Sequence, residues 1–291
     1  MRIRYLNRIK ANICIYASKK TANLFDGSYK SVFKGSSLNF EDLREYIPGD
    51  NVRDIDWKAS SRSRNLMVRR YVAERKHNIM LVFDSGIKMS GDTPAGENKK
   101  HLALMIGGTV GYIAAKNGDY VGSLSNHNSL IHYELFRVGI NNVEYIMAAY
   151  DGGDNLGAEC DLNKTLDFLA KNISRKMIIF IISDSKGIAS VSDTMLKTLK
   201  YRNDVLFVNL EDALLTDKDA FDVDSDNYFP GFLSKDKKLR EVEVNMRNRV
   251  REANTDRLEH NGIASVNISK EEDIVEKIVE LLEKHRYANN C

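Results

Sequence analysis

A short, uninterrupted apolar run that ends in an acid limits most strongly what this chain can fold into. Residues 177–183 read Met-Ile-Ile-Phe-Ile-Ile-Ser and are followed by Asp184. The run is too short for a typical helix, and a strand without a polar face must be covered on both sides of its sheet. The sequence therefore predicts a central, buried strand whose carboxyl end carries an acid.

Strand-like and helix-like segments alternate through residues 77–291. Apolar runs predict further strands at 78–84, 120–123, 129–135, 205–210 and 263–268. We expect 129–135 to run antiparallel to the strand before it. Caps and amphipathic spacing predict helices at 98–116, 143–150, after Asp161, at 192–200, at 237–260 and from a capping box at 269–272 onward. This alternation predicts an α/β fold with a doubly wound, mostly parallel sheet.

The N-terminal part differs from the rest in charge and in pattern. Residues 1–76 hold 17 Lys and Arg against 8 Asp and Glu, although the whole chain has a net charge of only +2. The first 20 residues can form a basic amphipathic helix, with Ile3, Leu6, Ile13 and Tyr16 on one side, that packs on the body. We predict residues 1–76 as a basic arm or small β subdomain and residues 77–291 as the sheet domain.

A dense polar segment, residues 44–57, ends at the chain's single tryptophan. Pro48-Gly49 suits the central positions of a type II turn, since proline fixes the first φ and glycine supplies the positive second one. This turn would bring the two halves of the segment together. The segment either forms a network that pins the arm to the sheet domain or is a recognition surface for a partner protein. Its candidate residues are Arg44, Tyr46, Gly49, Asp50, Arg53, Asp56 and Trp57.

Two acids, Asp84 and Asp184, follow predicted strands of the sheet. Carboxyl ends of parallel strands form the ligand-binding edge of such sheets, so both side chains should lie there. Two carboxylates about 4 Å apart repel by about 4 kcal/mol at an effective dielectric constant of about 20. A cation is therefore expected between them, supplied by a divalent metal or by the ammonium of Lys88.

Several of these motifs together resemble the signature of domain-of-unknown-function family 58. The most specific is Gly49-Asp50-x-x-Arg53-x-Ile55-Asp56-Trp57. The resemblance also includes Gly27 to Phe40, Ala59-Ser60-Ser61-Arg62, Phe83-Asp84, Asn117 to Gly122 and Ile182-Ser183-Asp184. Members of this family are MoxR-associated proteins with a von Willebrand factor A-like domain, so the resemblance implies a sheet of that type.

The resemblance also implies a metal-ion-dependent adhesion site, which this sequence matches only in part. Asp84 and Asp184 fit the acidic positions, whereas Gly86 and Lys88 stand where the family has serines, and Cys160 stands in the threonine position. Hard Mg²⁺ prefers oxygen ligands over thiol or ammonium. Our hypothesis is a degenerate site in which Lys88 bridges Asp84 and Asp184, with Mg²⁺ disfavoured and no cofactor expected.

The function implied by the resemblance is that of a non-enzymatic adaptor. It would act with a MoxR-type AAA+ ATPase in the assembly or remodelling of an unidentified client complex. No apolar run approaches the roughly 20 residues that span a bilayer, and basic residues interrupt the N-terminus. We therefore expect a cytoplasmic protein without a transmembrane segment.

Two other classes of function stay open. One is a divalent-metal-binding protein or hydrolase that uses Asp84 and Asp184, which requires a bound ion. The other is a binder of anionic surfaces, nucleic acid or lipid, through the basic N-terminal part. We do not expect nucleic acid as a partner, because the sequence has no stripe of interleaved aromatic and basic residues.

Overall fold

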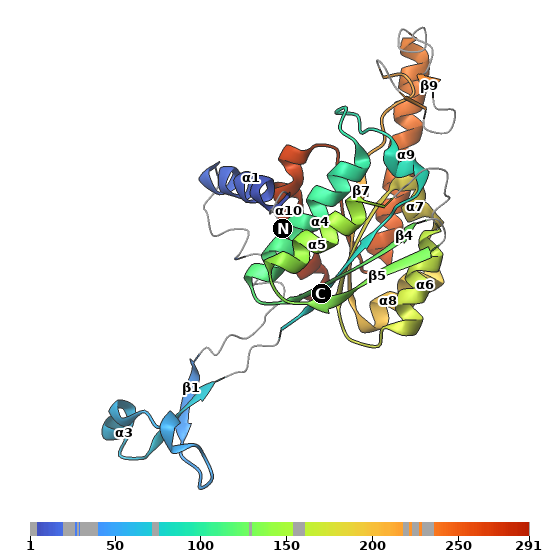
Figure 1. The fold of residues 1–291 in the computed structure, drawn as a ribbon. Helices are drawn as coiled ribbons and strands as arrows, with labels where there is room; N and C mark the ends of the chain where they lie inside the picture. The colour runs from blue at the N-terminus through green and yellow to red at the C-terminus, as the bar shows by residue number, and fades with distance from the viewer. Residues whose placement is uncertain are drawn as a thin grey trace. The chain divides into compact units, whose positions relative to one another are not determined.

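The computed structural model forms two compact units, one of residues Met1–Val32 with Asn78–Cys291 and the other of residues Phe33–His77 (Figure 1). It describes residues 5–19, 27, 29, 40–71, 76–127, 130–153, 161–217, 221–222, 227–228 and 236–290. Each unit is considered by itself below.

The larger unit is built on a six-stranded sheet with the order β10-β7-β6-β3-β4-β5. Its strands are β3 (Asn78–Phe83), β4 (Tyr120–His127), β5 (Leu130–Arg137), β6 (Ile178–Asp184), β7 (Asp204–Leu210) and β10 (Ala264–Ile268). The edge strand β5 is antiparallel to β4, and the other pairs are parallel. Strand β6 lies between β3 and β7 and is buried along its whole length. The predicted doubly wound, mostly parallel sheet and its central strand are confirmed.

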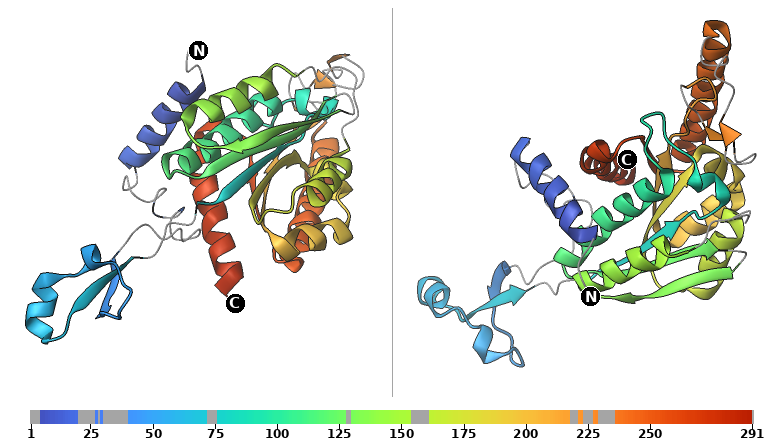
Figure 2. Two further views of the ribbon diagram at one scale, coloured as in Figure 1. Left: turned by 60° about the horizontal axis from the view of Figure 1, so that its bottom comes forward. Right: turned by 45° about the horizontal axis from the view of Figure 1, so that its top comes forward.

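Helices cover both faces of this sheet (Figure 2). One layer contains α1 (Tyr5–Lys19), α4 (Lys99–Lys116), α5 (Ile140–Asp151) and α10 (Ile274–Asn290). The other contains α6 (Leu162–Asn172), α7 (Ser185–Ser190), α8 (Asp193–Arg202) and α9 (Lys237–His260). Two-residue strands β8 (Phe221–Asp222) and β9 (Asn227–Tyr228) pair separately. Within the described residues, no helix combines the length and the apolar character needed to cross a bilayer.

Most helix ends lie where capping chemistry predicts them. Asp161 accepts a hydrogen bond from Lys164 N and so caps α6, and α9 has the predicted bounds. The capping box predicted at 269–272 is wrong. A 3₁₀ turn, η4 (Glu271–Asp273), precedes α10 without a side-chain cap. The amide of Glu271 instead donates to Glu97 Oε2 at 2.8 Å, so a carboxylate from another loop satisfies it.

The first helix belongs to the sheet unit, which corrects the predicted arm of residues 1–76. Leu6 and Ile9 of α1 are fully buried, and Ile9 is absent from the predicted apolar face. The carboxylate of Glu144 accepts hydrogen bonds from the amides of Tyr5 and Leu6 at 3.1 and 3.3 Å, which caps the start of the described helix. Arg8 forms a bidentate pair with Glu271 at 2.7 and 2.5 Å. The helix therefore packs on the body, as expected, and the separate unit is reduced to residues 33–77.

The smaller unit is a two-stranded antiparallel sheet with short helical segments between its strands. Its elements are β1 (Phe40–Glu45), η1 (Val52–Asp54), α3 (Trp57–Ser63) and β2 (Met67–Tyr71). Ile55 and Val68 are its buried apolar side chains among the described residues. Within the predicted β subdomain, residues 28 and 30–39 lie outside the described residues.

Glycines let α4 approach the sheet and its helical neighbours closely. A Cβ placed on Gly107 would lie 2.3 Å from Phe83 Cζ, and one placed on Gly108 would lie 2.5 Å from Ile9 Cδ1. The Phe83 ring is fully enclosed and stacks on Tyr150 with centroids 4.4 Å apart, so it has little room to yield. Helix α4 therefore depends on glycine at 107 for its distance from the sheet.

We expect Gly107→Ala to lower the free energy of unfolding. Overpacking of about 1–3 kcal/mol outweighs the gain of up to about 1 kcal/mol in helix propensity. Gly27→Ala is the matched control, because Gly27 is exposed and a Cβ placed on it would have no atom within 4 Å, and such changes stay within about 0.5 kcal/mol. Urea denaturation measures both. Equal stabilities of the two variants would contradict the close-packing account.

Candidate functional site

The two predicted acids lie side by side at the carboxyl edge of the sheet. Asp84 directly follows β3 and Asp184 ends β6, and these strands are paired neighbours with Phe83 opposite Ile182. Both acids are completely buried. A buried carboxylate is costly unless hydrogen bonds and an opposite charge compensate it. The surroundings of these two groups therefore decide what the site can do.

Lys88 lies between the two carboxylates, where our hypothesis places it. Its side chain comes from the 3₁₀ turn η2 (Ile87–Ser90), and its Nζ is 2.9 Å from Asp84 Oδ2 and 3.3 Å from Asp184 Oδ1. Burial lowers the pKa of Lys88, but the charges of Asp84 and Asp184 outweigh burial, so the net shift of the pKa is upward. The ammonium form is thereby stabilised.

A second lysine, Lys99, completes the network and is absent from the sequence-based site. It lies in the first turn of α4, is only 3% exposed, and places Nζ 3.2 Å from Asp184 Oδ2. The same Nζ also contacts Asp212. A lysine in the first turn opposes the preference of helix N-termini for negative charge. That misplaced charge is a sequence signal, but Lys100 in the same turn gives the same signal, so it does not single out Lys99.

Hydrogen bonds from neighbouring residues fix both carboxylates. The Ser183 hydroxyl donates to Asp84 Oδ2 at 2.5 Å, and the Gly187 amide at the start of α7 donates to Asp184 Oδ1 at 2.8 Å. Burial raises the pKa of Asp184, but the nearby Lys99 and Lys88 outweigh it, so the net shift is downward. Two ammonium groups thus face three carboxylates, including Asp212, and leave the cluster with one net negative charge.

The described residues do not offer a hard divalent cation the ligands it prefers. Gly86 has no side chain to contribute, and the Lys88 ammonium stands against both carboxylates. The remaining substituted position, Cys160, lies outside the described residues. Among the residues that are described, no group of three or more His, Cys, Asp or Glu side chains could hold a metal. This donor set does not fit Mg²⁺, which takes oxygen ligands.

Two serines at this edge are enclosed within the network. Ser183, whose hydroxyl bonds to Asp84, is completely buried and cannot reach a substrate. Ser85 is also buried, and its hydroxyl donates to the backbone carbonyl of Asn126. The edge is therefore an ion-pair cluster that ties together η2, α4, α7 and two strands.

In the smaller unit, the predicted turn at Pro48-Gly49 is confirmed. Gly49 has a φ of +110°, and Asp50 N donates to Ile47 O at 3.0 Å. Arg44 pairs with Asp50 at 2.6 Å, and Asp50 also accepts from Ile47 N. The Arg44 pair thus spans only the turn and does not extend to Asp56.

Asp56 instead forms a second, separate cluster. Its carboxylate accepts from Ala59 N at 3.0 Å, which caps α3, and pairs with Arg69 of β2 at 3.0 Å. Arg69 is a partner that the sequence-based analysis missed. The amide of Tyr46 donates to Leu66 O at 2.8 Å, so the residue after β1 is hydrogen-bonded to the residue before β2. These contacts all join residues within 33–77.

Three apolar side chains of this segment are left facing solvent. Ile47 and Val52 are each 60% exposed, and Trp57, the first residue of α3, is 66% exposed. The exposed Arg53 lies in η1 between Val52 and Trp57. We call Ile47, Val52, Arg53 and Trp57 the signature surface.

Replacing Lys99 with methionine is expected to destabilise the larger unit strongly. The change leaves Asp184 short of a buried counter-charge, which costs about 3–5 kcal/mol. Lys171→Met is the matched control, since Lys171 is exposed and pairs with Asp167 within one helix, a contact worth about 0–1 kcal/mol. Chemical denaturation at neutral pH measures both, and equal losses would contradict the proposed role of Lys99.

The network also predicts how stability depends on pH. Because the pKa of Asp184 is lowered on folding, its contribution is present above its unfolded pKa of about 3.9 and is lost as the pH falls through the lower, folded pKa. Because the pKa of Lys88 is raised, its contribution is complete below about 10.4 and is lost at higher pH. Denaturation as a function of pH should show a shallower acid decline for Asp184→Asn than for the wild type. An identical acid decline would contradict this assignment.

Comparison with known proteins places these observations in a family. The family model described as "Protein of unknown function DUF58" matches residues 42–218, which include the signature surface, Asp84 and Asp184. Curated relatives include the uncharacterized protein Rv1480 of Mycobacterium tuberculosis and the uncharacterized protein Mb1516 of Mycobacterium bovis. Each is 24% identical over 171 residues, covering 58% of this chain and 54% of the relative. The chain thus spans about half the length of the curated relatives it matches.

The chain is also similar, at low identity, to solved structures. A von Willebrand factor type A protein from Catenulispora acidiphila has a TM-score of 0.41 at 10% identity, covering 74% of this chain and 43% of that one. The conserved hypothetical protein BatB from Bacteroides thetaiotaomicron has a TM-score of 0.46 at 10% identity, covering 72% and 98%. The family model matches more than half of the sequence, and the chain belongs to the DUF58 family of proteins of unknown function.

Proposed function

We propose that this protein is a cytoplasmic, non-enzymatic adaptor that acts with a MoxR-type AAA+ ATPase in assembling or remodelling a client complex. The observation that carries the proposal is the signature surface. It exposes Ile47, Val52 and Trp57 on a short segment whose backbone is fixed by the Arg44–Asp50 and Asp56–Arg69 pairs. Ordered, exposed apolar side chains of this kind mark interaction sites.

The chemistry of the signature surface suits a protein partner. Tryptophan and arginine are the residues that most often dominate binding energy at protein interfaces. Trp57 and the exposed Arg53 supply both types within one short segment. Because the segment is already ordered, docking requires little further loss of conformational freedom.

The carboxyl edge of the sheet is not suited to binding a partner through a metal ion. A bound divalent metal could bridge to a carboxylate of a partner, but the ammonium of Lys88 stands between Asp84 and Asp184. Both ammonium groups of the cluster are already paired with its own carboxylates and are not free to bind a carboxylate of a partner. We therefore assign docking to the signature surface.

The proposal is tested with the purified MoxR-type ATPase of the same organism. We expect it to bind the full-length protein in at least one of the ATP and ADP states. Trp57→Ala and Arg53→Ala should each weaken binding by about tenfold or more. Tyr145→Ala is the control, since Tyr145 is an exposed aromatic residue on α5. Absence of binding in both nucleotide states, measured by biolayer interferometry, would refute the ATPase partnership.

Titration calorimetry with Mg²⁺ and Mn²⁺ tests the degenerate metal site and separates the adaptor from a metal-dependent hydrolase. Since an ammonium already compensates the two carboxylates, we expect no micromolar binding by the wild type. Asp84→Ala provides the control for any residual heat. Micromolar binding that disappears in Asp84→Ala would overturn the lysine bridge.

A further inference from the structure

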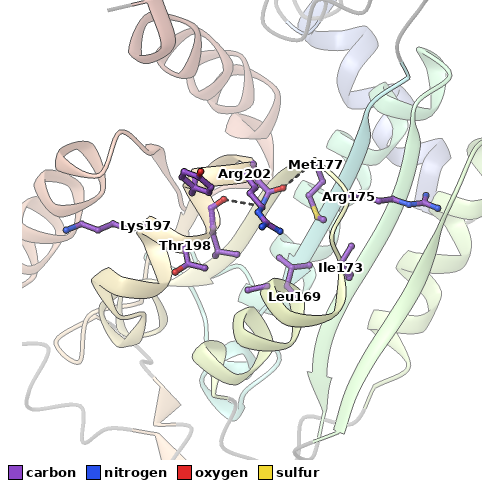
Figure 3. Close-up of a pocket in the computed structure, with 11 residues that line it drawn as sticks. Leu169, Ile173, Arg175, Met177, Lys197, Thr198 and Arg202 are labelled. Carbon is purple, nitrogen blue, oxygen red and sulfur yellow. Dashed lines mark hydrogen bonds between the residues drawn. The ribbon is translucent and has the colours of Figure 1, made fainter.

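A pocket opens at the edge of the sheet opposite to Asp84 and Asp184. It has a volume of about 540 Å³ and lies between α6 and α8, beside the amino ends of β6 and β7 (Figure 3). Asn203 holds the inner wall of the pocket in place. The Asn203 side chain accepts a hydrogen bond from Met177 N at 3.1 Å and donates one to Leu199 O at 3.1 Å. The pocket is thus part of the folded framework.

The floor of the pocket is apolar. It is formed by Leu169, Ala170, Ile173, Met177 and Leu199. The side chains of Leu169, Met177 and Leu199 also belong to the hydrophobic core, so the floor is held in place by packing. A floor of this kind accepts an apolar or aromatic side chain.

The rim of the pocket is basic. Arg175, Lys197 and Arg202 line it and are exposed, and none of the three pairs with a carboxylate among the residues that the structure describes. By contrast, the nearby exposed Lys171 forms an ion pair with Asp167. Tyr201, which is 86% exposed, adds an aromatic side chain to the rim.

We propose that this pocket docks an acidic segment of a partner protein, which inserts one apolar side chain between α6 and α8. The inference goes beyond the adaptor function, because it assigns a second contact surface on the larger unit. Unpaired cations around an apolar floor are complementary to carboxylates placed on either side of an apolar anchor.

The spread of the charges favours a protein segment over a single phosphate group. Figure 3 shows Lys197 and Arg175 extending outward on opposite sides of the pocket, with Arg202 between them. Tight recognition of a phosphate needs donors that converge on it, as in bidentate arginine contacts. Acids distributed along a peptide can instead reach cations that point in different directions.

The test measures fluorescence anisotropy of a labelled peptide, Glu-Glu-Phe-Glu-Glu, with the full-length protein at about 0.15 M salt. We expect binding, and a loss of about tenfold when the phenylalanine is replaced by serine or the glutamates by glutamine. The charge-reversal variant Arg175→Glu/Lys197→Glu/Arg202→Glu should weaken binding by at least about tenfold. Thr198→Trp, which narrows the mouth without changing charge, should weaken it as well.

A variant of equal net charge separates this site from a general effect of charge. Lys238→Glu/Arg249→Glu/Lys270→Glu alters exposed cations on other elements and should bind the peptide within about twofold of the wild type. Equal losses in the two triple variants would overturn the proposal, as would binding that is insensitive to Thr198→Trp. The proposal would also be overturned, in favour of a membrane surface, if the protein co-sedimented with phosphatidylserine vesicles but did not bind the peptide.

Discussion

Two carboxylates buried at the end of a parallel sheet impose the constraint on which the rest of this structure depends. Asp84 and Asp184 have no exposure to water, and charges so buried are tolerated only with close counter-charges and hydrogen bonds. Those partners come from well-separated parts of the chain. Lys88 comes from a turn, Lys99 from the start of α4, and the Gly187 amide from the start of α7. The cluster therefore fixes how these elements meet the sheet.

This constraint also shapes what the protein can do. An edge that is closed by its own lysines is a poor place for metal chemistry or for a partner's carboxylate. Two accessible features lie away from this cluster: the exposed signature surface of residues 47–57 and the basic pocket between α6 and α8. This distribution agrees with the adaptor that we propose, which would contact different partners through separate surfaces. Some of the excess positive charge near the N-terminus is neutralised by acids of the larger unit, as in the ion pair of Arg8 with Glu271.

Much of the larger unit could be predicted, because strands β3, β6 and β7 are apolar and buried along most of their length and several helices have local caps. The position of Lys88 followed from its spacing to Asp84 in one short turn. Lys99 could not be placed, since its partner Asp184 is far away in sequence and the pairing depends on how α4 packs. The same reason hid Arg69 as the partner of Asp56. The capping box failed because a 3₁₀ turn without a side-chain cap begins at Glu271, whose amide donates to Glu97 from a distant loop. Local signals thus predicted elements, and tertiary contacts decided the site.

A double-mutant cycle of Asp84→Asn and Lys88→Met measures whether lysine, and not metal, compensates the buried carboxylates. Free energies of unfolding would be measured once in EDTA and once in Mg²⁺. The account predicts a coupling energy of about 0.5–3 kcal/mol, the range for residues in direct contact, with the same value in both solutions. Negligible coupling, together with a rise in wild-type stability on adding Mg²⁺, would contradict it.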